Sequence, residues 1–104
     1  MSDSFNGLSP AEIERLAILM EEAGEVVQAV GKILRHGYES RHPVTQSNNR
    51  DELQKEIGDL RAAVTMMHNA GDIADCTIAG FEQIKLDKIG KYLHHQKIYS
   101  RGGT

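Results

Sequence analysis

The sequence predicts an all-α protein, an antiparallel helical bundle of three main helices that is completed by oligomerisation. The 104-residue chain has only 5% aromatic residues and no Trp, and aliphatic apolar residues suit helix packing better than sheet packing. No segment alternates apolar and polar residues over the length of a strand. A chain of this size buries a modest core as a monomer, and its helices have apolar residues on more than one face. We therefore expect a homodimer or homotetramer.

The first predicted helix spans residues 10–36. Ser9 to Glu12 has the pattern of a capping box with Pro10 at the first helical position, and Gly37 can adopt the left-handed conformation that ends a helix. Apolar residues at helical spacing predict a core-facing stripe that consists of Ile13, Leu16, Ala17, Met20, Gly24, Val27, Gly31 and Leu34.

Residues 37–49 form a predicted loop, because they contain Pro43 and many polar residues without a period. Loops of this length are often functional. Asn48 or Asn49 caps the second predicted helix, which spans residues 50–69 and has its own apolar stripe.

The third predicted helix begins at Asp72 or Asp75 and ends near Gln96. Residues 1–8 and 98–104 are expected to be loose ends. We see no internal repeat and no linker, so the whole chain, 1–104, is predicted to be a single domain.

Charge and cysteine content exclude several classes of function. Fifteen acidic and twelve basic residues give a net charge of −3, which disfavours binding to nucleic acid polymers or to membrane surfaces. The single cysteine, Cys76, excludes an intramolecular disulfide and fits a reducing compartment. Without an export signal or a segment of transmembrane length, the protein is expected to be soluble and cytoplasmic.

Two pairs of carboxylates at i,i+3 spacing are the main candidates for chemistry. Glu22 and Glu25 project away from the predicted core stripe, yet their neighbours on that side are apolar, and Glu56 and Asp59 border the apolar stripe of the second helix. We expect Glu22 and Glu25 to be half-buried, and Glu56 and Asp59 also have nearly apolar surroundings. Burying unpaired carboxylates is costly, so a cation should compensate, and oxygen ligands favour Mg²⁺ or Mn²⁺.

A bound Mg²⁺ usually keeps waters that substrate phosphates replace, so the pattern indicates a phosphorylated ligand. The alternative interpretation is that these are solvated faces of charged helices, paired with Lys32, Lys55 or Arg61.

The stretches Glu21-Glu22-Ala23-Gly24-Glu25 and Glu56-Ile57-Gly58-Asp59-Leu60 resemble the EExxE and ExxD motifs of the MazG-like all-α nucleotide pyrophosphohydrolases. The resemblance covers residues from about 12 to 92 and extends to the order of helix, loop and helix. The thirty residues between Glu25 and Glu56 are slightly more than is usual in the family. We assign the excess to the 37–49 loop.

The resemblance implies hydrolysis of a nucleoside or deoxynucleoside triphosphate to the monophosphate and pyrophosphate. It also implies that Glu22, Glu25, Glu56 and Asp59 bind Mg²⁺. In such a reaction a carboxylate takes the proton of the attacking water. Glu21 is the candidate for this base, although it also fits an exposed polar strip.

Glu52, one turn before Glu56, is the rival base or a ligand of a second metal ion. In the third helix, Lys85, Lys88 and Tyr92 share a side with Phe81 and are candidate substrate-binding residues. Their alternative role is to cover apolar surface while the charged ends reach water.

Other functional classes stay open at this point. The chain is alternatively a non-catalytic interaction module, antitoxin-like or adaptor-like, whose acidic helix faces bind a partner. It is alternatively a nucleotide-binding relative without activity. Within the enzymatic class, specificity for phosphoribosyl-ATP or for dUTP stays open, since base choice depends on loop residues.

Overall fold

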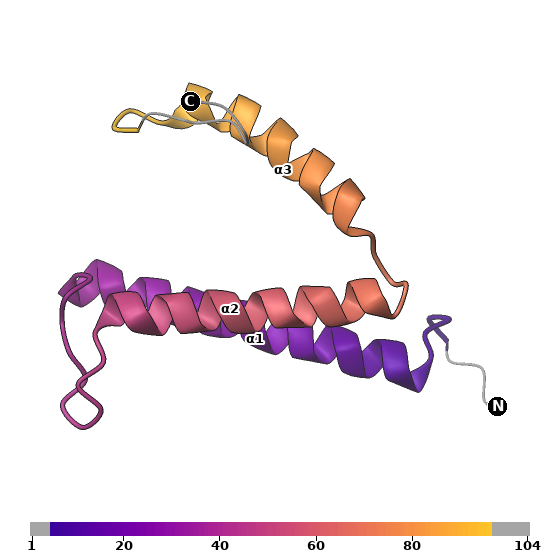
Figure 1. Cartoon of the computed structure of the whole chain (residues 1–104), viewed down its shortest axis with the longest axis horizontal. Helices are drawn as coiled ribbons and strands as arrows, with labels where there is room; N and C mark the ends of the chain where they lie inside the picture. Colours follow the sequence, from indigo (N-terminus) through magenta and orange to yellow (C-terminus); the bar gives the residue numbers. More distant parts are fainter. Residues whose placement is uncertain (1–4, 97–104) are drawn as a thin grey trace. The chain divides into compact units, whose positions relative to one another are not determined.

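The computed structural model describes residues 5–96, and this part of the chain is all-α. Its elements are α1 (Pro10–His36), α2 (Asn49–Asn69), α3 (Asp75–Ile89) and the short 3₁₀ helix η1 (Gly90–Tyr92) (Figure 1). The prediction of three helices without a strand is confirmed for these residues. The expectations for residues 1–4 and 97–104 lie outside the described residues. The chain divides after Asp72 into two compact units, and each is described by itself.

Both predicted caps of the first helix are present. The Glu12 amide donates to Ser9 Oγ at 3.1 Å, and the Ser9 amide donates to Glu12 Oε1 at 2.8 Å. Gly37 has φ 84°, in the left-handed region, and its amide donates to the Ile33 carbonyl at 2.7 Å. These contacts satisfy main-chain groups that a helix leaves unpaired at its ends.

Helices α1 and α2 lie side by side and antiparallel, joined by the loop at one end of the pair (Figure 1). Asn48 caps α2, since its Oδ1 accepts from the Asp51 amide at 2.8 Å. The predicted helix boundaries are therefore confirmed within one residue for both helices.

The predicted core stripe of α1 is wrong for this helix pair. Met20, Val27 and Leu34 in that stripe are 73%, 70% and 82% exposed. The face of α1 that meets α2 contains Ala29, which is only 8% exposed, and also contains the half-buried Glu22. The periodicity identified an apolar face, but it could not tell which face meets the next helix, because both faces of α1 are partly apolar.

The loop between α1 and α2 is an ordered hairpin. The Arg50 amide donates to the Tyr38 carbonyl at 3.0 Å, and the Asn49 amide donates to the Ser40 carbonyl at 2.9 Å. The His42 amide then donates to the Ser47 carbonyl at 2.8 Å. This ladder fixes the positions of the loop side chains relative to both helices.

Arg15 and Asp72 form a two-point ion pair between α1 and the residue that ends the first unit. Arg15 Nε donates to one carboxylate oxygen at 2.6 Å and its Nη2 donates to the other at 3.0 Å. The guanidinium of Arg15 lowers the pKa of Asp72 by this hydrogen bond, against the opposing effect of burial. Paired N–H donors of this kind fit a carboxylate better than any single donor.

We expect Asp72→Asn to lower the melting temperature. Because the pKa of Asp72 is lowered in the folded state, its stabilising contribution is present above the ordinary Asp pKa and is lost as pH falls through the lowered value. The loss caused by Asp72→Asn should thus be smaller under acidic conditions. Thermal melts of Arg15→Gln, Asp72→Asn and the double variant provide the check. Additive losses would show that the pair is not coupled.

The second unit, residues 73–96, contains α3 and the η1 turn that packs against it. Helix α3 is shorter than predicted: it ends at Ile89 and not near Gln96, and Gly90 begins the 3₁₀ turn. No residue of α3 is fully buried, and Phe81 is 67% exposed. None of the helices within residues 5–96 has the length and apolar character needed to cross a membrane.

Candidate metal centre

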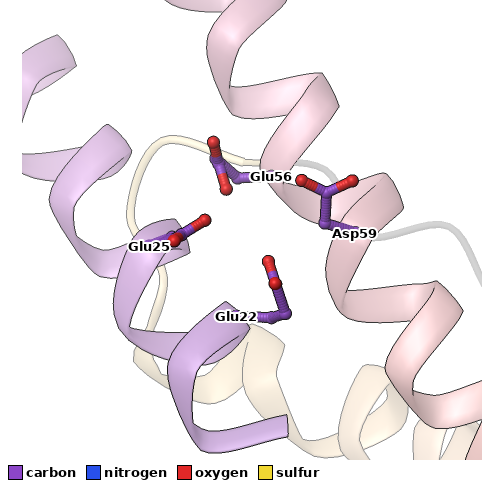
Figure 2. Close-up of side chains that lie close together, drawn as sticks. All are labelled: Glu22, Glu25, Glu56 and Asp59. Carbon is purple, nitrogen blue, oxygen red and sulfur yellow. The ribbon is translucent and has the colours of Figure 1, made fainter. Parts of the chain in front are cut away.

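Four carboxylates converge between α1 and α2. Glu22 and Glu25 extend from α1, Glu56 and Asp59 extend from α2, and Figure 2 shows the four side chains directed toward one another. One carboxylate oxygen from each residue lies within 4.8 Å of the other three. The i,i+3 spacing on each helix produces this arrangement, since residues three apart lie on the same helix face.

Two oxygens of this cluster are buried without a hydrogen-bond partner, Oε2 of Glu22 and Oε2 of Glu56. Such atoms carry the full cost of leaving water, and buried polar groups in folded proteins nearly always have partners. Four carboxylates, two of which each have a buried oxygen without a partner, fit a divalent cation such as Mg²⁺ or Mn²⁺. The residues that are present therefore suit the metal that the sequence led us to expect.

One protein cation approaches the cluster from the α2 side. Lys55 Nζ lies 2.9 Å from Asp59 Oδ2 and 3.6 Å from Glu56 Oε1. The alternative of charged helices with paired side chains is thus partly realised on α2. Within residues 5–96, however, the ion pairs of the structure include neither Glu22 nor Glu25. One lysine leaves most of the negative charge of the cluster uncompensated.

The close approach of these carboxylates changes the pKa of Glu56. Its pKa is raised above the ordinary value, first by the side-chain hydrogen bond with the Glu25 carboxyl, which requires a proton on one of the two acids, and then by burial. Lys55 acts in the opposite direction. Like charges held close together disfavour ionisation in this way, and a divalent cation in the cluster would restore the ionised form.

A cavity of about 250 Å³ adjoins the cluster on the side toward the loop. Two of the four converging carboxylates, Glu25 and Glu56, line it. The full lining comes from both helices and consists of Glu25, Gln28, Ala29, Lys32, Asn49, Glu52 and Glu56. A ligand in this cavity would have direct access to the candidate metal ligands.

The two candidate bases occupy different surroundings. Glu52 is half-buried, lines the cavity, and accepts a hydrogen bond from Ser47 Oγ at 2.6 Å through its Oε1. Glu21 is exposed and is not among the four converging carboxylates. This difference favours Glu52, while the catalytic role of either residue stays a prediction.

The predicted substrate-binding residues Lys85, Lys88 and Tyr92 lie in the second unit and are exposed. Their role stays a prediction. Gln28 and Asn49 also line the cavity, and sequence reasoning did not name either as a candidate site residue. Gln28 follows Glu25 by three positions, so helical spacing alone could have placed it beside the cluster. Asn49 was considered only as a helix cap.

Comparison with known proteins agrees with this geometry. Residues 12–90 match the MazG nucleotide pyrophosphohydrolase domain. The chain belongs to the MazG family. Its acidic cluster corresponds to the EExxE and ExxD motifs of this MazG domain. The recognition made from the motifs is therefore confirmed.

The Gene 37 protein of Mycobacterium phage L5 is similar to this MazG chain. The two are 38% identical over 71 residues, which cover 68% of this chain and 55% of the phage protein. The chain therefore spans about half the length of this curated relative. No solved structure matches the chain significantly.

Proposed function

We propose that this protein hydrolyses a nucleoside or deoxynucleoside triphosphate to the monophosphate and pyrophosphate with Mg²⁺ as cofactor. The observation that supports this most strongly is the set of four carboxylates, with oxygens within 4.8 Å of one another and two buried oxygens lacking a partner. Membership of the MazG family supports the reaction class.

In this proposal Glu22, Glu25, Glu56 and Asp59 hold the cation, which when bound neutralises the charge of the triphosphate. Lys55 holds Asp59 in place through their 2.9 Å contact. Glu52 takes the proton of the attacking water, since it lines the same cavity and its Oε1 is oriented by the Ser47 hydroxyl. Its second oxygen is then available for the water.

The reaction class can be tested by incubating the protein with each common NTP and dNTP, with Mg²⁺ or with EDTA. Release of pyrophosphate and monophosphate in equal amounts, only with the metal, is the expected result. Release of orthophosphate would place the protein in another reaction class. Absence of any product, with no effect of Mg²⁺ on thermal stability, would favour the non-catalytic interaction module.

We also propose that the protein forms a homodimer or homotetramer, with the exposed apolar stripe of α1 in the interface. Met20, Val27 and Leu34 are each at least 70% exposed, and apolar surface of this kind is normally covered in soluble proteins. Light scattering coupled to size-exclusion chromatography should give a mass above that of one chain. A monomer of native stability would contradict this proposal.

A further inference from the structure

A second cavity, of about 330 Å³, continues the groove away from the carboxylates. It shares Lys32, Asn49 and Glu52 with the first cavity, so the two adjoin. Its other lining residues come from the end of α1 and from the hairpin. Five of the lining side chains are basic or imidazole groups: Lys32, Arg35, His36, Arg41 and His42. A chain with a net charge of −3 thus concentrates hydrogen-bond donors at one end of its groove.

Two of these donors are held in place by the hairpin itself. Arg41 Nη1 donates to the Gln46 carbonyl at 2.7 Å, which leaves the other guanidinium N–H groups available. His42 Nδ1 accepts from the Val44 amide at 3.1 Å. Because that nitrogen is an acceptor, the proton of the neutral ring is on Nε2. Both side chains therefore offer donors whose orientation is already fixed, so binding a ligand costs little additional conformational entropy.

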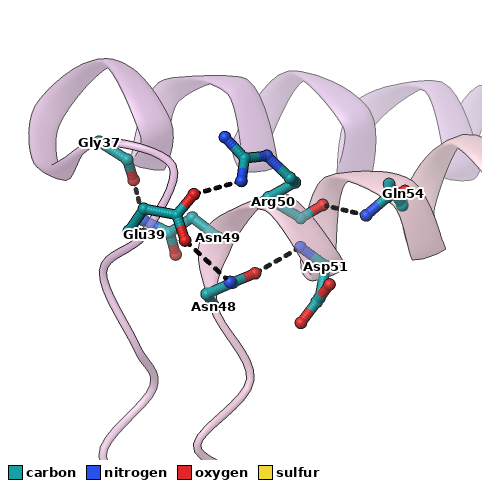
Figure 3. A network of polar contacts seen from close by, with 7 residues as sticks. All are labelled: Gly37, Glu39, Asn48, Asn49, Arg50, Asp51 and Gln54. Atoms are coloured by element: carbon teal, nitrogen blue, oxygen red, sulfur yellow. Dashed lines mark hydrogen bonds and ion pairs between the residues drawn. The ribbon is translucent and has the colours of Figure 1, made fainter.

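The base of the hairpin is fixed by a polar network (Figure 3). Arg50 forms an ion pair with Glu39 and lies over the ring of Tyr38, 4.8 Å from its centroid. Asn48 Nδ2 also donates to Glu39, at 3.3 Å. These contacts connect the two arms of the hairpin to the first turn of α2, so the basic cavity has ordered walls.

Where the two cavities join, the groove contains the oppositely charged Lys32 and Glu52 together with Asn49. Gln28 and Asn49 provide amides, and Ala29 provides a buried methyl group. Asn49 Nδ2 donates to the Gly37 carbonyl at 3.0 Å, and since that carbonyl is only an acceptor, the amide orientation is determined. The Asn49 Oδ1 is left as an acceptor. Amides beside an apolar surface suit a sugar or a nucleobase, which have both hydrogen-bonding edges and apolar faces.

We infer that the preferred substrate is a nucleotide with a second phosphate group at the end remote from its triphosphate. This inference rests on the proposed function. The groove presents carboxylates for a metal-bound triphosphate, then the amides of Gln28 and Asn49 beside Lys32 and Glu52 for the nucleoside, and then donors for another anion. Glu25 and Arg35 are ten residues apart on α1, about 15 Å along a straight helix. A nucleoside, rather than one phosphate, spans such a separation, and Arg groups match phosphate geometry.

The test compares ATP with ATP that has an additional 2′- or 3′-phosphate, measured as kcat/KM for pyrophosphate release. We expect the extra phosphate to raise kcat/KM by about tenfold or more for at least one of the two isomers, the effect of one charge-assisted hydrogen bond. Arg35→Gln and Arg41→Gln should each reduce this ratio toward one. Arg61→Gln, an exposed arginine of α2 outside both cavities, is the matched control and should keep the ratio.

A binding measurement without metal separates this inference from the proposed function. In EDTA, adenosine 2′- or 3′-monophosphate should shift the NMR amide signals of the hairpin residues 40–47, and adenosine alone should not. Such shifts in a protein that hydrolyses no triphosphate would support the basic site and contradict the proposed reaction. Hydrolysis with equal kcat/KM for all three substrates would overturn the inference alone. A preference that survives both Arg35→Gln and Arg41→Gln would also overturn it.

Discussion

Glu56→Gln is expected to lower kcat/KM for pyrophosphate release by about 100-fold or more while raising the thermal stability of the metal-free protein. Loss of a group that merely supports a metal ligand typically costs 10–100-fold, and Glu56 is proposed as a ligand itself. The stability gain follows because the variant removes a carboxyl whose pKa is raised by contact with Glu25 and by burial. Steady-state kinetics with Mg²⁺ and thermal melts in EDTA measure the two effects.

The opposite signs of these two effects distinguish a functional cluster from a structural one. Substitution of a residue that merely stabilises the helix pair would lower the activity and the thermal stability of the protein together. Glu14→Gln is the matched control, since Glu14 is an exposed glutamate of α1 that lies outside the cluster, and this variant should change neither quantity. A fully active Glu56→Gln enzyme would show that the ligand assignment is wrong.

Sequence reasoning located the helices and the four carboxylates because both depend on local rules. Capping residues such as Ser9 and Asn48 determine where α1 and α2 begin, and the i,i+3 spacing determines that each carboxylate pair shares one face. The apolar neighbours of Glu22 and Glu25 on the same helix face were sufficient to predict that both residues are half-buried, which the structure confirms. Packing of one helix against the other then predicted that the two pairs are directed at one volume, and the motif contains the same four residues.

Features that depend on distant contacts were not predictable. The packed face of α1 was misassigned, because the exposed stripe with Met20 and Leu34 is more apolar than the carboxylate face that meets α2. The sequence of residues 37–49 has no alternating pattern that would predict a hairpin. The hairpin is held by hydrogen bonds between main-chain groups, and the side chains do not indicate which of these groups pair. The role of Arg41 and His42 as cavity walls follows from that ladder.

Mg²⁺ is expected to raise the melting temperature, and the increase should grow with pH. In the metal-free protein the pKa of Glu56 is raised, so the folded state binds more protons than the unfolded state. Stability therefore falls as pH rises from the ordinary Glu value, about 4.3, through the raised value. Mg²⁺ requires ionised carboxylates and competes with this proton, so its effect should be smallest at the acidic end of this range.

Near neutral pH, Mg²⁺ at 100 times its dissociation constant would add about 2.7 kcal/mol, a shift on the order of 10 °C for a chain of this size. Melts at matched ionic strength with Na⁺ in place of Mg²⁺ separate specific binding from charge screening. Glu56→Gln should lose most of the Mg²⁺-dependent shift, because one ligand is gone. An equal shift in that variant, or one independent of pH, would mean that the cation binds elsewhere, and that the buried oxygens of Glu22 and Glu56 have another partner.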